Sequence, residues 1–559
     1  MVRPLTSIWC LLSLLLSFLN STAQTEPFTK RTVVSGLNSA WEVVYGPNDS
    51  LWVTENRAYL ISRISIATGA KTVLVDLRAT DASINFTAAV ANPPQGGLMG
   101  LVIHPNLYSS DPGVRAAKPW VYAAYVYNRG SCPGNGTSCI YTTKIVRYTY
   151  SGNTLNSPVT VINTIPGSSD HNSGRLVISP VIEPGADAAH TQYRLYYTVG
   201  DMGAGQFQNA TRAENAQDVD IMEGKVLRLN TESDGDAGQD EWIPNDNPFY
   251  EGSSITPQDY VYSLGHRNAQ GLVWGNVSGT NILYSTEQMD RSDDEVNIIE
   301  PGKNYGWDQV AGYCEGNVNG YKIGQNLSAN EQAFCVVTPT HTEPIFTTFT
   351  ETAANMPALM AQPNNALWPT IACSSVDFYG QNKIPGWNYS LLISPLKHDK
   401  VYRVRLNGTG TDVTGDTISY FRGDGNRVRR ITIAPDGLRF YVARDASATI
   451  NGGAIMEYTY AGVILALHEN PGARPVKVDD LISIYPNPAG NILNIHGKRE
   501  LRKPLLVQIY DIQGRMLITQ TSFRNDFSVD VSDFTPGTYL LKLYNGNNME
   551  VQIVKFIKK

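Results

Sequence analysis

Charged side chains are scarce in this chain, and they form no long basic run. Only 17% of the 559 residues are charged, and the formal net charge is −7. Without a basic stripe, nucleic acid and anionic membrane surfaces are excluded as general partners. Hydrophobic residues reach 42%, so the composition is typical of a folded, β-rich, exported protein and not of a disordered one.

Long apolar runs are also lacking, apart from one at the N-terminus. Arg3 is followed by an apolar run that ends at Leu19, and small residues occupy positions 21–23. This pattern predicts a secretory signal peptide over residues 1–23, with cleavage after Ala23. The alternative, a membrane anchor, needs a longer run to cross a bilayer.

Cysteines are few. The chain has six, and one of them lies in the predicted leader. Export permits disulfides. Cys132 and Cys139 flank a turn-rich loop that can bring them together, and Cys314 and Cys335 are the next plausible pair. Cys373 would then be unpaired, and we expect it to be buried. The sequence alone leaves the connectivity open.

One pattern recurs along most of the chain: an apolar, β-branched strand, a turn, and a second strand that ends in a polar residue. Residues 41–48 and 51–55 form the first such unit. The other five are 97–105 with 120–125, 174–180 with 193–198, 271–274 with 282–287, 375–379 with 390–394, and 430–437 with 440–443. Strands that alternate with turns predict an all-β structure. A closed ring of four-stranded sheets accounts for both the repetition and the length, with a site at one end of its channel.

The repeats end before the C-terminus, which places the repeat domain at residues 24–466, a linker at 467–480 and a small C-terminal β-sandwich at 481–559. This last domain opens on Tyr-Pro-Asn-Pro at 485–488, contains Pro-Gly-Thr-Tyr at 536–539 and ends on basic residues. These features resemble the C-terminal sorting domain of the bacterial type IX secretion system. The resemblance implies a secreted or cell-surface protein that engages that machinery. The alternative is a generic β-sandwich that binds carbohydrate or packs on the first domain.

The candidate catalytic stretch begins where Asp170 directly precedes His171, followed by turn residues and an apolar run. A neutral imidazole accepts a proton near neutral pH, and an adjacent carboxylate can fix its tautomer and stabilise its cation. An ordinary loop histidine is the alternative, because an isolated motif is weak evidence. Further stretches favour the catalytic interpretation. They are 265–272, 287–295 continuing to 304–307, and 427–429.

Together, and in this order, these motifs resemble the soluble, calcium-dependent quinoprotein glucose and aldose-sugar dehydrogenases, which use pyrroloquinoline quinone (PQQ). The resemblance covers about residues 28–460. It implies a six-bladed β-propeller, PQQ and Ca²⁺ as cofactors, and oxidation of an aldose sugar at its anomeric carbon to a lactone. No Cys-x-x-Cys-His haem motif is present, so electrons would leave to a separate external acceptor. Relatives form dimers, and a homodimer is compatible with the resemblance.

The resemblance assigns a set of cofactor-binding residues. PQQ is a planar quinone with three carboxylates, for which guanidinium groups are well suited. Arg267 and Asn268 match the pair that contacts the quinone, and Arg267 would stabilise the charge that develops there. The remaining matches are Gln288, Thr370, Lys397, Arg427 and Arg429. Without the resemblance, Arg427 and Arg429 would be read as a solvated basic strand, since alternate strand residues share a face.

His171 matches the family's catalytic base, and Asp170 matches the residue that orients it and assists substrate binding. Matches to substrate-contacting residues are Gln95, Gln206, Phe207 and Trp368. Phe207 stands where the glucose enzyme has a smaller aliphatic side chain, and Asn365 falls near a wall position that is aromatic there. These two departures point to a pocket shaped for another aldose or for an oligosaccharide end. His266 is interpreted as structural.

Two calcium sites are implied. The cofactor's calcium would be held by the backbone carbonyls of Met289 and Asp290, where the family usually has Gly-Pro, and Asp290 can add a carboxylate ligand. A second, structural calcium is implied by matches at four residues. These are Glu295, Tyr305, Ala311 and Tyr313, with Glu315 and Glu343 as weaker candidates.

Two other functions compete with the sugar dehydrogenase. A non-catalytic propeller at the cell surface would bind glycans or protein, take up no PQQ and tolerate loss of His171. A six-bladed hydrolase or lactonase with a channel calcium would need a ring of inward acidic and amide ligands, which the motifs do not supply. The co-occurrence of His171, the 267–268 pair, Lys397 and the 427/429 pair favours the dehydrogenase.

Overall fold

The computed structural model describes residues 27–86, 96–131, 139–185, 191–206, 209–235, 241–252, 254–318, 322–323, 327–328, 330–337, 341–362, 367–415, 417–425, 427–445, 451–462, 482–497, 505–511, 515–522, 524–544 and 550–559. The predicted leader and the predicted linker lie outside these residues. Within them, no helix has the length and apolarity needed to cross a membrane.

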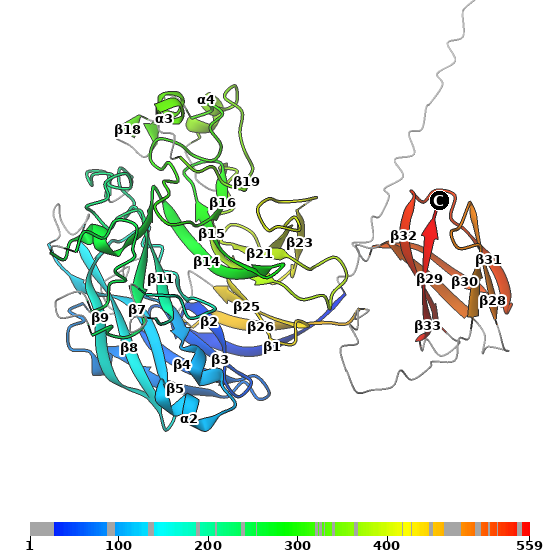
Figure 1. The fold of residues 1–559 in the computed structure, drawn as a ribbon, viewed down its shortest axis with the longest axis horizontal. Coiled ribbons are helices and arrows are strands. Elements are labelled where there is room, and N and C mark those ends of the chain that lie inside the picture. Colours follow the sequence, from blue (N-terminus) through cyan, green and yellow to red (C-terminus); the bar gives the residue numbers. More distant parts are fainter. Residues whose placement is uncertain are drawn as a thin grey trace, which may run out of the picture.

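The described residues between 28 and 460 include six antiparallel sheets of four strands each (Figure 1). The first two sheets contain β2 (Ala40–Gly46), β3 (Ser50–Glu55), β4 (Leu60–Ser65) and β5 (Lys71–Asp76), and then β6 (Leu98–Ile103), β7 (Trp120–Arg129), β8 (Tyr141–Ser151) and β9 (Thr154–Gly167). The next two contain β10 (Leu176–Ile178), β11 (Arg194–Val199), β12 (Lys225–Asn230) and β13 (Val261–Leu264), and then β14 (Asn268–Val277), β15 (Thr280–Gln288), β16 (Asp294–Ile298) and β19 (Phe346–Thr348). The last two contain β20 (Cys373–Tyr379), β21 (Ser390–Pro395), β22 (Val401–Arg405) and β23 (Ile418–Tyr420), and then β24 (Arg427–Ile433), β25 (Arg439–Asp445), β26 (Gly453–Tyr460) and β1 (Phe28–Leu37).

Helices are short and lie in the connections. They are α1 (Leu77–Thr80), α2 (Pro112–Ala117), α3 (Glu331–Val337) and α4 (Met356–Met360), with 3-10 turns at Pro105–Tyr108 and Pro257–Tyr260. A further hairpin joins β17 (Lys322–Ile323) to β18 (Leu327–Ser328). The predicted all-β class is therefore confirmed.

The strand pairs expected from the sequence repeat are the first two strands of the six sheets. The first strands of neighbouring sheets contact one another in the order β2, β6, β10, β14, β20 and β24, and β24 contacts β2 again. The last sheet is completed by the N-terminal strand, because β1 pairs antiparallel with β26 and places Phe28 opposite Tyr460. The sequence analysis did not foresee this long-range pairing.

A buried ion pair lies where these first strands meet. Arg175, just before β10, pairs through Nη1 with Glu42 of β2, and both side chains are at most 2% exposed. Arg175 also donates from Nε to the Gln270 carbonyl of β14 at 2.8 Å and from Nη2 to the Ser374 carbonyl of β20 at 2.9 Å. Glu42 accepts a second bond from Nε of Arg430 in β24 at 2.7 Å. These contacts join five sheets at the centre, and we call them the hub.

The C-terminal residues form two further sheets. One contains β27 (Ile482–Tyr485), β28 (Ile492–Gly497) and β31 (Asp526–Asp530), and the other contains β29 (Leu505–Asp511), β30 (Met516–Ser522), β32 (Gly537–Tyr544) and β33 (Glu550–Lys558). Buried side chains of both sheets, such as Leu493, Val507 and Leu541, share one apolar core. The two C-terminal sheets therefore share one core, and the β-sandwich stays a prediction.

The hub generates a stability prediction. Glu42→Gln leaves Arg175 and Arg430 without their buried counter-charge, and breaking a buried ion pair in this way costs about 3–5 kcal/mol. Glu232→Gln is the matched control, because Glu232 and its partner Lys118 are 28% and 32% exposed and exposed pairs contribute about 0–1 kcal/mol. Urea unfolding followed by circular dichroism compares the two. Equal losses of stability in both variants would contradict a special role for the hub.

Candidate functional site

His171 lies on the loop between β9 and β10, with its backbone in the left-handed region at a φ of 46°. The carbonyl of His171 packs against Gly200 so closely that a Cβ there would lie 1.8 Å from it. The imidazole Nδ1 lies 2.8 Å from Oδ1 of Asp201, which is 1% exposed and also accepts from the backbone of Gly203 at 2.9 Å. The loop therefore fixes the imidazole against a buried carboxylate.

The carboxylate at Nδ1 was missed by the sequence analysis, which expected Asp170 to orient the ring. Asp170 accepts instead from the backbone N–H of His171 at 3.0 Å, and its Oδ1 lies 3.9 Å from Nε2. Asp201 lies two residues after the end of the buried strand β11, and this position was a sequence signal that could have identified it. With Nδ1–H donating to Asp201, Nε2 of His171 is the acceptor nitrogen.

Gln206 lies between this acceptor and Arg267. Its Nε2 is 2.8 Å from Nε2 of His171, and its Oε1 accepts from Nη2 of Arg267 at 3.2 Å. The structure thus brings together Gln206, His171 and Arg267, which were predicted as a substrate contact, the base and a quinone contact. Gln95, Phe207 and Asn365 lie outside the described residues.

Arg267 and Asn268 meet Gln288 where β14 begins and β15 ends. Arg267, 4% exposed, donates from Nη1 to the carbonyls of Gln288 and Met289 at 3.0 and 2.8 Å. Its Nε is buried without a hydrogen-bond partner among the described residues. Asn268 donates to Oε1 of Gln288 at 3.0 Å, and Gln288 donates to the carbonyl of Cys373 at 2.8 Å.

The expected calcium loop at 289–290 is held from behind by Asp294. This carboxylate accepts the backbone N–H of Met289 at 2.9 Å and those of Ile371 and Ala372 at 2.7 Å. Burial raises the pKa of Asp294 to about 6, while these hydrogen bonds oppose the rise. The loop is therefore tied to the segment that precedes β20.

Asp290 supplies a carboxylate on the same loop. It pairs with Arg291, and its Oδ1 lies 3.6 Å from Nη2 of Arg267. The guanidinium of Arg291 lies 4.9 Å from the ring of the half-buried Trp368. The carbonyl of Met289, a predicted metal ligand, is engaged by the cationic side chain of Arg267.

Arg427 and Arg429 converge on one carboxylate, Oδ2 of Asp445, at 2.8 and 3.4 Å. The sequence analysis expected both arginines to bind cofactor carboxylates and did not identify Asp445. Burial and the neighbouring Arg427 lower the pKa of Arg429 to about 10. Burial alone would raise the pKa of Asp445, but Arg429 and Arg427 hold it below its ordinary value. Nε of Arg429 is buried without a partner among the described residues, so one carboxylate does not satisfy this pair.

Lys397 adds a third cation. Its Nζ donates to Oγ1 of Thr370 at 2.6 Å and to the carbonyl of Trp368 at 3.1 Å. Burial lowers the pKa of Lys397, and Asp294 opposes the change. The structure thus places the predicted Thr370 and Lys397 in direct contact.

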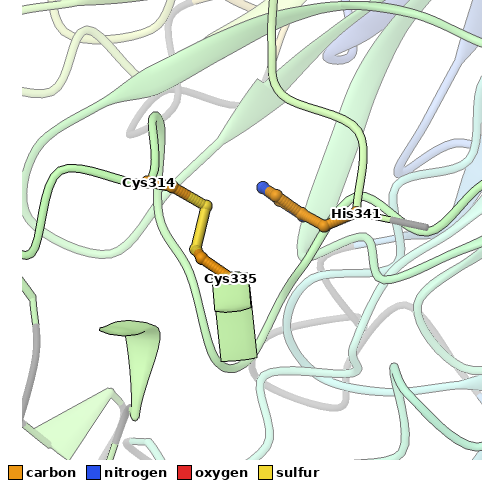
Figure 2. A group of neighbouring side chains, drawn as sticks. All are labelled: Cys314, Cys335 and His341. Carbon is orange, nitrogen blue, oxygen red and sulfur yellow. A yellow bond between two sulfur atoms is a disulfide. The ribbon is translucent and has the colours of Figure 1, made fainter. Parts of the chain in front are cut away.

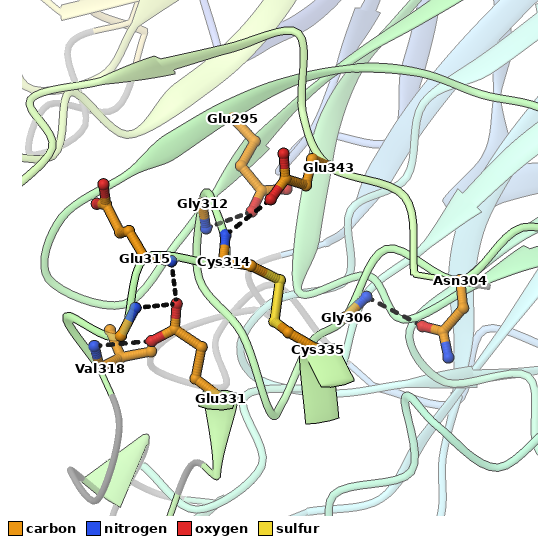
Figure 3. Close-up of a disulfide and its surroundings, with 11 residues drawn as sticks. Glu295, Asn304, Gly306, Gly312, Cys314, Glu315, Val318, Glu331, Cys335 and Glu343 are labelled. Carbon is orange, nitrogen blue, oxygen red and sulfur yellow. Dashed lines mark hydrogen bonds between the residues drawn. A yellow bond between two sulfur atoms is a disulfide. The ribbon is translucent and has the colours of Figure 1, made fainter. Parts of the chain in front are cut away.

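The residues expected to hold a second calcium surround the turn at 311–315. Glu295, 1% exposed, accepts from the backbone of Gly312 at 2.8 Å, and Glu343 accepts from that of Cys314 at 3.1 Å (Figure 3). Burial and the charge of Glu287 raise the pKa of Glu295 well above its ordinary value. Tyr305 and Ala311 are buried nearby in sequence, and burial raises the pKa of the Tyr313 phenol, with Glu343, Glu315 and Glu295 adding to the effect.

Cys314 and Cys335 form a disulfide, and Cys373 is unpaired and buried, both as expected. Cys132 lies outside the described residues. His341 lies beside the disulfide, with its ligand atom within 4.8 Å of both sulfurs (Figure 2). Because both sulfurs are used in the S–S bond, this group offers no thiolate to a metal. Glu331 of α3 fixes the same turn by accepting three backbone N–H groups, those of Glu315, Gly316 and Val318.

His266 is enclosed in the core, in agreement with its structural interpretation. Its ring lies between Oγ of Ser263 at 2.9 Å and Oε2 of Glu287 at 3.0 Å, and it stacks on Tyr305 at 4.7 Å. These contacts use both ring nitrogens, so His266 has no nitrogen left for a substrate.

Comparison with known proteins decides the family. Residues 37–452 match the family model described as glucose / sorbosone dehydrogenase. The chain belongs to this family. Among its relatives, quinoprotein glucose dehydrogenase B of Acinetobacter calcoaceticus is 30% identical over 487 residues, which cover 78% of this chain and 92% of the relative. The family expected from the motifs is confirmed, and with it a sugar oxidoreductase.

Solved structures share the fold of this chain. The PQQ-bound aldose sugar dehydrogenase of Streptomyces coelicolor has a TM-score of 0.50 at 24% identity and covers 77% of this chain and 98% of its own. The soluble apo aldose sugar dehydrogenase of Escherichia coli has a TM-score of 0.54 at 23% identity, with 78% and 99% covered. Residues 483–559 match the secretion system C-terminal sorting domain, so the predicted sorting domain is present.

A buried lysine lies behind the base side of the site. Lys225 is fully buried and donates to the carbonyls of Asn215, Ala216 and Glu223 at 3.0, 2.9 and 2.7 Å. Burial lowers the pKa of Lys225 to about 7, and the charge of Glu214 opposes the shift.

This shift predicts a pH dependence of stability. Below about pH 7 Lys225 is charged in both the folded and unfolded states, whereas between about pH 7 and 10.5 only the unfolded state keeps the proton. The unfolded state then binds more protons, so stability rises with pH in this window. Lys225→Met removes that rise. Urea midpoints at pH 6.5, 8 and 9.5 test it, with Lys383→Met as the control at an exposed lysine. Parallel curves for wild type and Lys225→Met would contradict the prediction.

Proposed function

We propose that this glucose/sorbosone dehydrogenase is an exported, PQQ- and calcium-dependent enzyme that oxidises aldose sugars at the anomeric carbon to lactones. The observation that carries the proposal is the hydrogen-bonded link from a carboxylate-supported histidine, His171, through Gln206 to Arg267. A base for the sugar hydroxyl and a cation for a developing anion thus lie side by side. In this proposal the six sheets are the six blades of the propeller, and the site lies at one end of its channel.

The donor set fits a planar quinone with three carboxylates. Lys397, Arg427 and Arg429 supply three buried or half-buried cations, while Asp445 is the one carboxylate bonded to the two arginines. The unpartnered Nε atoms of Arg267 and Arg429 have hydrogen bonds to give, and buried donors without partners are costly. Asn268, Gln288 and Thr370 complete the set. When bound, PQQ supplies the acceptor for the hydride that leaves the sugar.

The chain's own residues handle the proton. Neutral His171 accepts the proton of the anomeric hydroxyl at Nε2, and Asp201 stabilises the resulting imidazolium through Nδ1. Asp170 faces the same Nε2 and holds the sugar hydroxyl. Gln206, which donates to Nε2 in the described structure, gives way to that hydroxyl and bonds the sugar, together with Gln95. Trp368 and Phe207 form apolar walls.

Calcium fits two places in this proposal. The carbonyls of Met289 and Asp290 would hold the cofactor's ion, and binding there replaces the hydrogen bond from Arg267 to Met289. The carboxylate of Asp290 adds a hard oxygen ligand that calcium prefers. The second ion would bind Glu295, the carbonyls of Ala311 and Tyr313, and Tyr305. Oδ1 of Asp293 next to it is buried without a partner among the described residues, which a cation would satisfy.

The route of export follows from both ends of the chain. The leader at 1–23 directs the chain through the inner membrane, and the sorting domain matched at 483–559 directs it through the type IX machinery to the cell surface or the medium. The enzyme then meets its sugar and an external electron acceptor outside the cell, as a monomer or a homodimer.

Reduction of a dye by the purified mature protein tests the function. We expect turnover on a panel of aldoses that requires both PQQ and Ca²⁺ and stops in a chelated control. A shift in PQQ absorbance without turnover would support the proposed PQQ-binding site and show that the tested sugars are not substrates. The absence of both a shift and turnover would contradict the proposal and favour a propeller that only binds glycans or protein.

His171→Ala tests the base. We expect kcat to fall by about 10²–10⁴-fold, the usual contribution of a general base, while the Kd for PQQ stays within a few-fold of wild type. His496→Ala, at a 51% exposed histidine side chain of the C-terminal domain, is the control and should keep full activity. Steady-state kinetics and PQQ titration measure both. Near-wild-type turnover in His171→Ala would refute its assignment as the base.

A further inference from the structure

The indole of Trp307 contacts both the base side and the cofactor side of the site. Its Nε1 donates to Oδ2 of Asp201 at 3.1 Å, and the other oxygen of Asp201 holds His171. Its ring lies 5.1 Å from the guanidinium carbon of Arg267, within the range of a cation–π contact. Trp307 is 2% exposed, so both contacts are made away from water.

The same N–H separates two buried acids. It also donates to Oε2 of Glu214 at 3.2 Å, so one donor is shared between Asp201 and Glu214. Burial and the charges of Asp201 and Asp308 raise the pKa of Glu214 well above its ordinary value. Lys225 faces Glu214 from behind, at a distance that lets their charges interact. Without the indole N–H, Asp201 would still lie near the carboxyl group of Glu214, but the donor that both acids share would be lost.

The charged groups that face the imidazole of His171 are the ones described for the site. Asp170 and Asp201 face the two ring nitrogens, and Arg267 is linked to the ring through Gln206. Trp307 therefore acts on the base only through Asp201, and on Arg267 through its ring face. These two actions can be separated, because phenylalanine keeps a ring and lacks the N–H.

We propose that Trp307 is a positioning residue of the sugar-oxidising site. Its N–H holds the Asp201 carboxylate in place for His171, and its ring face holds Arg267. The proposal rests on the proposed function, since it takes His171 as the base and Arg267 as the cofactor contact.

Trp307→Phe is the first test. Loss of a donor to a buried carboxylate raises the proton affinity of the His171–Asp201 pair as a whole, whichever member takes the proton. The acid limb of the kcat/KM profile should move to higher pH by about one unit, and kcat at neutral pH should fall about tenfold. The sugar KM and the Kd for PQQ should change by less than about threefold, because the ring face remains.

Trp52→Phe is the matched control. Trp52 is 1% exposed, and its N–H has no hydrogen-bond partner among the described residues, so the same chemical change removes no donor from a carboxylate. Its kcat and acid limb should match wild type. Trp307→Phe would overturn the proposal if it behaves like Trp52→Phe. It would also overturn it if Tm, PQQ binding and activity collapse together, since that pattern belongs to a purely structural residue.

A second measurement tests the contact between Trp307 and Asp201 directly. It does not depend on enzyme activity or on the folding of the Trp307→Phe variant. In the ¹⁵N-indole spectrum of the PQQ-free full-length mature protein, Asp201→Asn should move one tryptophan N–H resonance upfield, because a neutral amide accepts a weaker hydrogen bond than a carboxylate. Unchanged indole resonances would overturn the link between Trp307 and Asp201. Failure of the wild type to oxidise any sugar would instead refute the proposed function, so the two failures are distinguishable.

Discussion

The ion pair of Arg175 with Glu42 is the contact on which the rest of the repeat domain depends. It is buried at the point where the first strands of the sheets meet, and its hydrogen bonds reach carbonyls of β14 and β20 and, through Glu42, a side chain of β24. The site residues stand on these same strands or directly beside them: Asn268 begins β14, and Arg427 begins β24. The hub therefore lies among the strands that carry these residues, and it cannot shift without leaving a charge unpaired.

Much of the fold could be predicted because its signal is local. A strand, a turn and a second strand are read from period-two alternation and turn residues within about 15 positions, and all six predicted pairs are the first strands of the sheets. The partner of β1 could not be read this way. Nothing in residues 28–37 indicates that they pair with 453–460, since the two strands lie more than 400 residues apart in the chain.

The site residues also fall into those that sequence motifs predict and those that come from distant segments. Residue types in motifs predicted His171, Arg267 and Asn268, and the structure links these three through Gln206 and Gln288. They also predicted Lys397 and Arg429, which contact Thr370 and Asp445. What sequence reasoning missed are the partners from other segments: Asp201 for the imidazole, Asp445 for the two arginines and Trp307 between the two sides. Adjacency in the chain favoured Asp170 as the orienting acid, but neighbouring residues on a tight loop point to different sides of the ring. Contacts between different sheets depend on how the sheets pack together, and a single sequence carries no record of them.

The pairing of β1 with β26 has a consequence for the order of events during folding. β1 is the first described strand to be synthesised, yet its hydrogen-bonding partner is the last strand of the repeat domain. Their sheet cannot be completed before residue 460 has been made, so Phe28–Leu37 waits as an unpaired edge strand. Such edges recruit other strands. The charged and hydroxyl-bearing residues at 29–32 keep that waiting edge soluble until the chain is complete.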